Sequence, residues 1–182
     1  MVGCLRRPRF LKDRQEVGEI MEQSARAHLA PFQMEFIQKL SQLGSAPFHQ
    51  LIAPAGAGKT TAAIVAVQNM IAVGMADRVL VLADRKELGR QYVSALREEI
   101  RDIPVGHIER RTLRELESRV AVGSSPWPEQ IVAVMTMDLS GREDVIESLT
   151  TVNWDLLIVD DAGHMGGMGR AGLDRLLSEG AV

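Results

Sequence analysis

A short stretch near residue 50 combines glycine, lysine and threonine at spacings that can bind phosphate. The segment His49–Thr61, HQLIAPAGAGKTT, begins with an apolar run, continues through a glycine-rich loop and ends in a Lys-Thr-Thr run that opens a helical pattern. Gly56 and Gly58 allow backbone conformations that direct successive N–H groups inward, and the start of the next helix adds its dipole. The stretch therefore predicts a concave anion site for the phosphates of a nucleotide.

Four residues of this stretch, Ala53, Gly58, Lys59 and Thr60, occupy the fixed positions of the Walker A pattern, with alanine at the first position where glycine is more usual. Lys59 is suited to neutralising the β- and γ-phosphates, and the Thr60 hydroxyl to Mg²⁺, which takes oxygen ligands. The predicted nucleotide contacts are Ala55, Gly56, Ala57, Gly58, Lys59, Thr60 and Thr61. The alternative for Thr61 is packing or capping, and for the whole stretch it is a glycine-rich turn with an incidental lysine.

A second candidate element is the acidic pair that ends the apolar run Leu156–Asp160, LLIVD. Asp160 is expected to hold Mg²⁺, directly or through water, and Asp161 stands where a P-loop ATPase keeps the residue that polarises the attacking water. The catalytic candidates are thus Lys59, Asp160 and Asp161, and the metal candidates are Thr60 and Asp160. Taken alone, such a pair could simply cap the next helix, so the prediction depends on its combination with the glycine-rich loop.

Alternating apolar runs and amphipathic stretches predict the elements that position these residues. Short runs rich in Val, Ile and Leu predict strands buried on both faces. These strands are expected at Arg78–Ala83, Ile131–Thr136 and Leu156–Asp160, with a brief one at Val105–Ile108. Helical patterns cover residues 62–73, 87–101 and 142–149. The alternation predicts an α/β fold with a parallel sheet and helices on both faces.

In such a sheet, ligands bind at the carboxyl ends of the strands. Ala53, Ala83, Thr136 and Asp160 fall at those ends in the predicted arrangement. We therefore expect the polar residues just beyond them to converge on one edge of the sheet.

Both ends of the chain are expected to lie outside this sheet. Residues 1–12 are basic and unpatterned, which predicts a solvated terminus, and residues 13–43 read as helical in two pieces divided near Pro31. We expect a helical extension at residues 1–44 and the nucleotide-binding lobe at 45–182. Residues 163–172 are rich in glycine and are expected to be mobile before a short helix at 173–177.

The composition limits the class of protein. The 182 residues suffice for one substantial domain, and 46% hydrophobic with 25% charged residues is typical of a globular protein. The net charge of −3 gives no overall basic excess, so any nucleic-acid binding needs a local patch. A single cysteine, Cys4, excludes an internal disulfide and a cysteine-based zinc cluster. With no membrane-length apolar run and no apolar signal core, the expected location is the cytoplasm, without membrane association.

Four segments in this order resemble motifs I, Ia, Ib/Ic and II of the superfamily two helicases and translocases, the DEAD/DEAH, restriction-enzyme and Swi/Snf-like group. The segments are LIAPAGAGKT, RVLVLADRKELGRQY, VMTMDLS and WDLLIVDDAGH, and the resemblance covers roughly residues 30–164. It implies a RecA-like ATP-binding lobe, with ATP and Mg²⁺ as cofactors and nucleic acid, DNA rather than RNA, as partner. Phe32-Gln33 resembles the Q-motif region, whose glutamine reads adenine; the alternative for Gln33 is an exposed position on a helix.

The resemblance also implies the nucleic-acid contacts. Arg85 and Lys86 beyond the second strand, and Thr136 at the end of a later one, lie where the family touches the nucleic-acid backbone. Cations and a hydroxyl at strand ends are suitable phosphate contacts, which position a strand without reading its sequence. The alternative for Arg85 and Lys86 is an exposed, solvated first helical turn.

Motif II departs from the family pattern, since Asp161 replaces glutamate and Gly163 stands at the fourth position of Asp-Asp-Ala-Gly-His. The shorter Asp161 side chain displaces the presumed base, and general-base geometry is intolerant of such shifts. The sequence also carries no motif III, second RecA-like lobe or arginine finger. We therefore expect weak or no turnover in isolation, and a second lobe or subunit as partner.

Two other functions stay open at this point. One is a degenerate, non-catalytic nucleotide-binding or interaction module that keeps the fold. The other is a different P-loop enzyme, a small-molecule kinase or a GTPase, which ranks last because no Asn-Lys-x-Asp guanine motif is present.

Overall fold

The computed structural model describes residues 2–6, 29–41, 48–101, 103–109, 127–161 and 167–178, and at 2–6, 41, 48–50 and 167–169 it describes the backbone alone. Six strands form one sheet in the order β2-β1-β6-β3-β5-β4. Their bounds are β1 Val2–Arg6, β2 Phe48–Leu51, β3 Arg78–Ala83, β4 Val105–Ile108, β5 Ile131–Thr136 and β6 Leu156–Asp160. Strands β3 to β6 have the bounds predicted from their apolar runs.

The part of the sheet formed by β6, β3, β5 and β4 is parallel. This confirms the predicted α/β class. Because the parallel strands are in register, Ala83 pairs with Thr136, and Leu82 pairs with Val159 one residue before Asp160. The residues predicted to follow strand ends are thus brought to one edge of the sheet.

Strand β1 corrects the prediction of a solvated N-terminus. It lies between β2 and β6 and pairs antiparallel with both, with Cys4 opposite His49 and Ile158. The physical reason is that each neighbour otherwise leaves a row of backbone N–H and C=O groups unpaired, and a short segment with Val2 and Leu5 satisfies both rows. The division of the chain at residue 44 stays a prediction.

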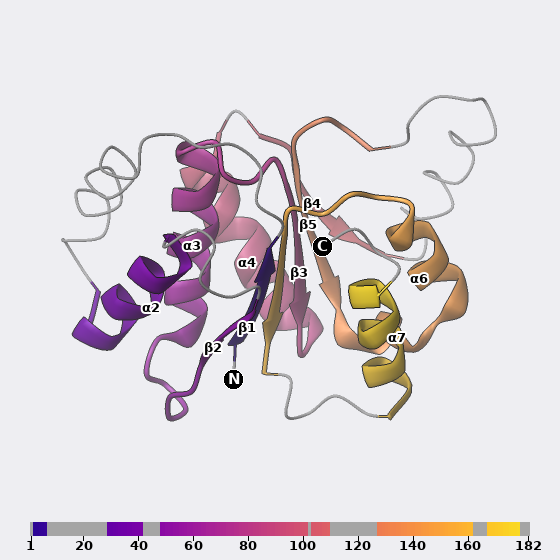
Figure 1. Cartoon of the computed structure of the whole chain (residues 1–182), viewed down its shortest axis with the longest axis horizontal. Helices are drawn as coiled ribbons and strands as arrows, with labels where there is room; N and C mark the ends of the chain where they lie inside the picture. Colours follow the sequence, from indigo (N-terminus) through magenta and orange to yellow (C-terminus); the bar gives the residue numbers. More distant parts are fainter. Residues whose placement is uncertain are drawn as a thin grey trace.

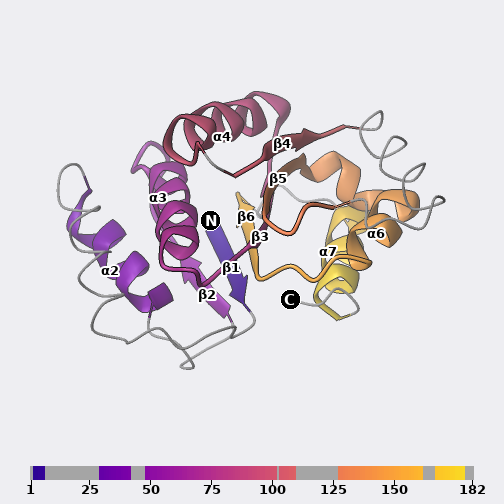
Figure 2. The same ribbon diagram turned by 90° about the horizontal axis from the view of Figure 1, so that it is seen from above.

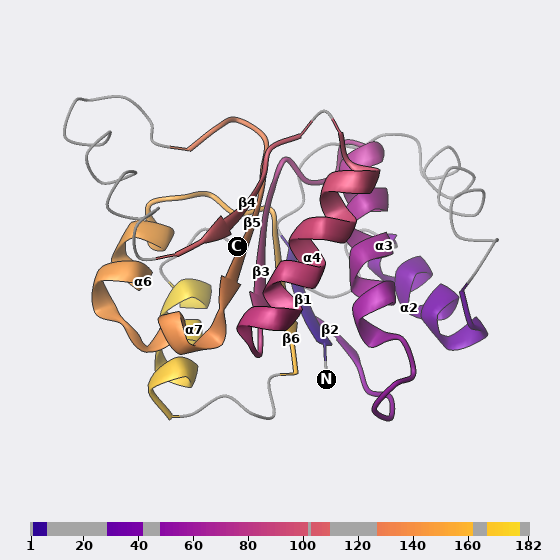
Figure 3. The same ribbon diagram turned by 180° about the vertical axis from the view of Figure 1, so that it is seen from behind.

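Helices cover both faces of the sheet, as the sequence predicted. Figures 1 and 2 show α2, α3 and α4 on one side of the sheet and α6 and α7 on the other. In Figure 3, which shows the molecule from behind, α4 lies in front of the strands. The bounds are α2 Pro31–Ser41, α3 Lys59–Ala72, α4 Lys86–Glu99, η1 Met137–Gly141, α6 Glu143–Thr150 and α7 Gly167–Ser178. The helical pattern at residues 13–28 and the glycines at 163 and 166 lie outside the described residues.

Each face of the sheet has its own apolar core. One core joins α2, α3 and α4 to alternate strand residues such as Val79, Val81 and Ile158. The other joins α6 and α7 to the intervening residues, with Trp154 and Trp127 in edge-to-face contact at 5.5 Å between ring centroids. Apolar side chains therefore point to both faces, which is why these strands read as continuous apolar runs.

Helix α7 corrects the prediction of a mobile glycine-rich tail, because Gly167 to Gly172 are helical. The glycine at 172 serves close packing: a Cβ there would collide with the carbonyl oxygen of Ser140 in η1. Leu176 is fully buried in the second core. The lack of a side chain at residue 172 therefore allows α7 to pack closely against η1.

Among the described residues, no helix combines the length and apolar character needed to cross a bilayer.

Candidate functional site

The glycine-rich loop leaves β2 and leads directly into α3. Gly56 and Gly58 adopt positive φ angles of 76° and 82°, which L side chains rarely adopt. Gly58 is the N-cap of α3. Because glycine has no side chain, the N-cap offers no side-chain acceptor to the first N–H groups of the helix. Ala55 and Gly56 are exposed, while Ala57 and Gly58 are partly buried. The loop therefore has the open, glycine-dependent backbone expected of an anion site.

Lys59 is held by this loop. Its ammonium donates hydrogen bonds to the backbone carbonyls of Ala53 and Pro54, each at 2.9 Å. The side chain thus folds back over the loop that would receive phosphate. A bound phosphate would offer the ammonium charged acceptors in place of neutral carbonyls, which is the stronger kind of hydrogen bond.

Thr60 and Asp160 join the two predicted elements. The Thr60 hydroxyl donates to Asp160 Oδ2 at 2.9 Å, across a separation of 100 residues. Asp160 is 2% exposed, and Thr60 is partly buried in the first turn of α3. A hydroxyl and a carboxylate side by side next to this glycine-rich loop are oxygen ligands of the kind that Mg²⁺ takes.

No cluster of three or more His, Cys, Asp or Glu side chains that could hold a metal occurs within the described ranges. Mg²⁺ usually binds through one or two protein oxygens, substrate phosphates and water rather than through an all-protein cage. The pair of Thr60 and Asp160 therefore fits a magnesium nucleotide better than a free metal ion.

Tyr92 is a third partner in this cluster, and its role was missed at the sequence level. Its hydroxyl donates to the same oxygen, Asp160 Oδ2, at 2.8 Å. Burial, and next the charge of Asp160, raise the pKa of the Tyr92 hydroxyl well above its usual 10.0. Tyr92 lies in the helical pattern predicted at residues 87–101, where it was given no role of its own. The available signal was a polar hydroxyl on a helix face that is otherwise aliphatic.

Gln33 lies in α2 and contacts the back of the loop. Its side-chain amide donates to the carbonyl of Gly58 at 2.7 Å and to that of Ala57 at 3.4 Å. Its amide oxygen accepts a hydrogen bond from the backbone N–H of Ala30 at 2.7 Å. At 5% exposure it is buried, which excludes the alternative of an exposed glutamine.

Asp161 follows Asp160 with a left-handed backbone, at φ 64°. Aspartate visits this region more readily than longer side chains because its short polar side chain can hydrogen-bond locally. This gives a physical reason for aspartate where the family pattern has glutamate. Ala162, Gly163 and His164 lie outside the described residues.

A separate cavity of about 410 Å³ opens at the same edge of the sheet, beyond β3, β4 and β5. Arg85, Lys86 and Thr136 all line it, so the three predicted nucleic-acid residues are brought together. Thr136 is 8% exposed, whereas the Arg85 and Lys86 side chains are 68% and 52% exposed. The cavity is thus lined by a largely buried threonine and two accessible cations.

The cations of this cavity face carboxylates. Arg85 is 3.4 Å from Asp84, and Lys86 is 3.4 Å from Glu109. Asp138 lines the cavity as well. Three carboxylates therefore accompany two permanent cations, so this is not a simple basic patch.

The structure combines a parallel sheet that has helices on both faces with a glycine-rich loop hydrogen-bonded to the acidic end of β6. The chain belongs to the family described as type III restriction enzyme, res subunit, whose model matches residues 26–173. It is thus a helicase/translocase-like N-terminal lobe of superfamily two.

The chain is also similar to RNA polymerase-associated protein RapA. The similarity is 28% identity over 141 residues for the proteins of Sodalis glossinidius (strain morsitans) and Yersinia pestis, and 27% for that of Serratia proteamaculans (strain 568). Each alignment covers 77% of this chain and 14% of the relative. The chain therefore spans a small part of the length of these relatives.

Proposed function

We propose that this chain binds ATP·Mg²⁺ as the N-terminal lobe of a helicase- or translocase-like protein that acts on nucleic acid, with weak or no turnover in isolation. The observation that carries the proposal is the 2.9 Å hydrogen bond from Thr60 to Asp160, which joins the phosphate loop to the acidic strand. Lys59 would neutralise phosphate charge, and Thr60 and Asp160 would hold the magnesium ion, which supplies charge stabilisation when bound.

Nucleotide binding is tested with Lys59→Ala. We expect its affinity for ATP·Mg²⁺ to fall at least tenfold, because a charge-assisted contact to phosphate contributes on the order of 1.5–3 kcal/mol. The measurement is titration calorimetry with Mg²⁺. The matched control is Lys39→Ala, which removes an exposed lysine paired with Glu35 on α2. Unchanged affinity in Lys59→Ala would remove the site assignment.

The nucleic-acid part of the proposal is supported by the cavity lined by Arg85, Lys86 and Thr136. DNA is favoured over RNA because the matching family is named for restriction enzymes. The exposed Ala55 and Gly56 are the part of the loop that a second RecA-like lobe or subunit would cover.

The second candidate function is a nucleotide-binding or interaction module without catalysis. It is favoured by Asp161, whose side chain is shorter than the expected glutamate and whose backbone is left-handed. ATP turnover measured with and without single- and double-stranded DNA separates the two functions. Robust DNA-stimulated hydrolysis by this chain would exclude the module.

A further inference from the structure

The buried face of α4 contains one tyrosine. Tyr92 is 0% exposed, as is Leu96 one turn later, and Val93 beside it is 8% exposed. A hydroxyl taken into an apolar core costs free energy unless it is hydrogen-bonded, whereas phenylalanine would fill nearly the same space without that cost. The hydroxyl of Tyr92 therefore needs an explanation beyond packing.

The hydroxyl reaches the carboxylate that the proposed function assigns to Mg²⁺. Tyr92 donates to Asp160 Oδ2 at 2.8 Å, and Thr60 donates to the same atom at 2.9 Å. The donors come from α4 and α3, and the acceptor ends β6, so three separate elements meet at one oxygen. Two donors from different directions fix the orientation of a carboxylate better than one.

We propose that Tyr92 is a positioning residue that holds the Asp160 carboxylate in the orientation required for magnesium nucleotide, an inference that rests on the proposed ATP·Mg²⁺ function. It does not touch the nucleotide itself. Residues that orient a metal ligand typically change metal affinity 10- to 100-fold when they are removed.

Helix α4 begins at Lys86, which lines the cavity beyond β3, and the same helix contacts Asp160 through Tyr92.

The first experiment compares Tyr92→Phe with the wild-type chain in ATP binding, once with Mg²⁺ and once with EDTA. We expect about tenfold weaker binding with Mg²⁺ and unchanged binding with EDTA, because only the metal-dependent part needs the oriented carboxylate. Asp160→Asn is expected to abolish the increase in ATP affinity that Mg²⁺ causes. The control is Leu96→Val, which changes a buried residue of α4 one turn beyond Tyr92. This variant is expected to keep the increase in ATP affinity.

The outcomes separate this inference from the function on which it rests. If Lys59→Ala and Asp160→Asn weaken binding but Tyr92→Phe keeps the full effect of Mg²⁺, the positioning role is wrong and the nucleotide site stands. If none of the three weakens binding, the proposed function fails. An equal loss with Mg²⁺ and EDTA in Tyr92→Phe would also overturn the positioning role.

Discussion

At the scale of single residues, ion pairs limit how readily phosphate can reach the cations that line the cavity beyond β3. The Lys86 ammonium, 3.4 Å from Glu109, lowers the pKa of that carboxyl, so Glu109 is charged at neutral pH. Glu109 also lies 3.4 Å from Nδ1 of His107. Both side chains of the Lys86 pair are 52% exposed, so the pair is screened and easily exchanged. A nucleic-acid phosphate would have to compete with Glu109 for Lys86.

We therefore predict that Glu109→Gln strengthens DNA binding a few-fold. The substitution removes the competing carboxylate and leaves Lys86 free for a phosphate, which should steepen the dependence of affinity on salt by about one charge. The measurement is fluorescence anisotropy with a DNA duplex at several salt concentrations.

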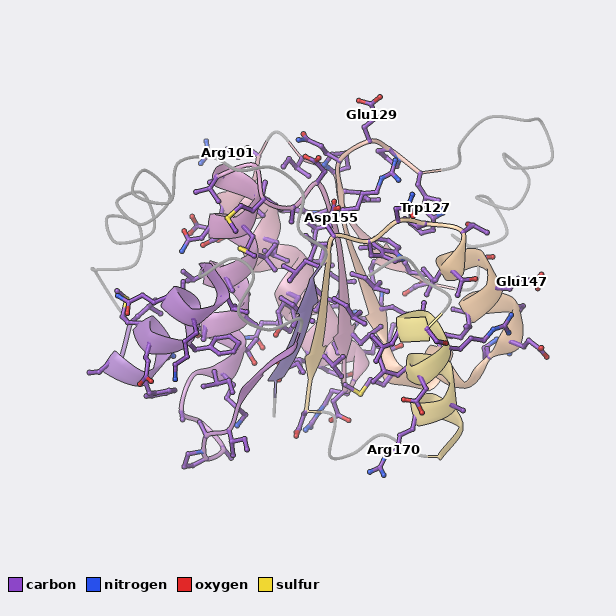
Figure 4. The ribbon with its side chains drawn as sticks, in the orientation of Figure 1. Arg101, Trp127, Glu129, Glu147, Asp155 and Arg170 are labelled. Carbon is purple, nitrogen blue, oxygen red and sulfur yellow. The ribbon has the colours of Figure 1, made fainter. Side chains whose placement is uncertain are left out.

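Glu147→Gln is the matched control, because it makes the same charge change on α6, where the side chain points outward (Figure 4) and does not line the cavity. Equal effects of the two variants would indicate net charge alone. No effect of either would argue against Lys86 as a phosphate contact.

At the scale of elements, α2 supports the phosphate loop through Gln33. The amide of Gln33 approaches Gly58 so closely that a Cβ on Gly58 would collide with its nitrogen. Gly56 also has a positive φ, yet a Cβ there would meet nothing within 4 Å. The two glycines share a left-handed backbone, which would strain any L residue, and they differ in steric contact.

This difference predicts unequal effects of alanine. Gly56→Ala should destabilise the fold by about 1 kcal/mol, the cost of a left-handed backbone for an L residue. Gly58→Ala should cost at least about 1 kcal/mol more, because overpacking adds to it. Urea denaturation measures both.

Gln33→Ala in the Gly58→Ala background should recover the steric part, and the double-mutant cycle should give a coupling free energy. Equal destabilisation by the two single glycine substitutions, with no coupling to Gln33, would show that the contact is unimportant.

Prediction from sequence succeeded for elements whose signal is local. Arg78–Ala83 and Ile131–Thr136 are buried on both faces, so continuous apolar runs mark them fully. The loop and Lys59 were predicted as a phosphate site because nucleotide phosphates require that spacing, and this role stays a prediction. The partner of Tyr92 was not predictable, since no spacing rule links it to Asp160 across a sequence separation of 68. The hydrogen bonds of Gln33 likewise depend on how α2 packs.

At the scale of the whole molecule, the sheet depends on β1, a strand that the sequence pattern does not predict. Strand β1 is only five residues long, contains a glycine and ends in arginine, so its apolar content is too small to identify it. Its position between β2 and β6 is decided by the neighbours, which lie far along the chain. At the amino-terminal ends of the parallel strands, Asp155 accepts hydrogen bonds from the backbone N–H groups of Asp77 and Arg78 (Figure 4). These bonds connect the start of β6 to the start of β3.

We predict that Cys4→Pro destabilises the whole lobe by about 3 kcal/mol. Residue 4 pairs with His49 on one side and Ile158 on the other, and proline removes its N–H and does not fit an interior strand. Urea denaturation is the measurement, with Cys4→Ala as a control that keeps the backbone ladder. A proline variant as stable as the alanine variant would place β1 outside the stable sheet.

The antiparallel direction of β1 has a practical consequence for work with this protein. Val2 lies opposite both Leu51 and Asp160, so the chain enters the sheet at the edge that carries the phosphate loop and the acidic strand, near the lower border of the ribbon in Figure 1. A purification tag joined directly before β1 would start on the side of the sheet that carries the glycine-rich loop. Binding measurements therefore call for a tag that is cleaved off or attached elsewhere.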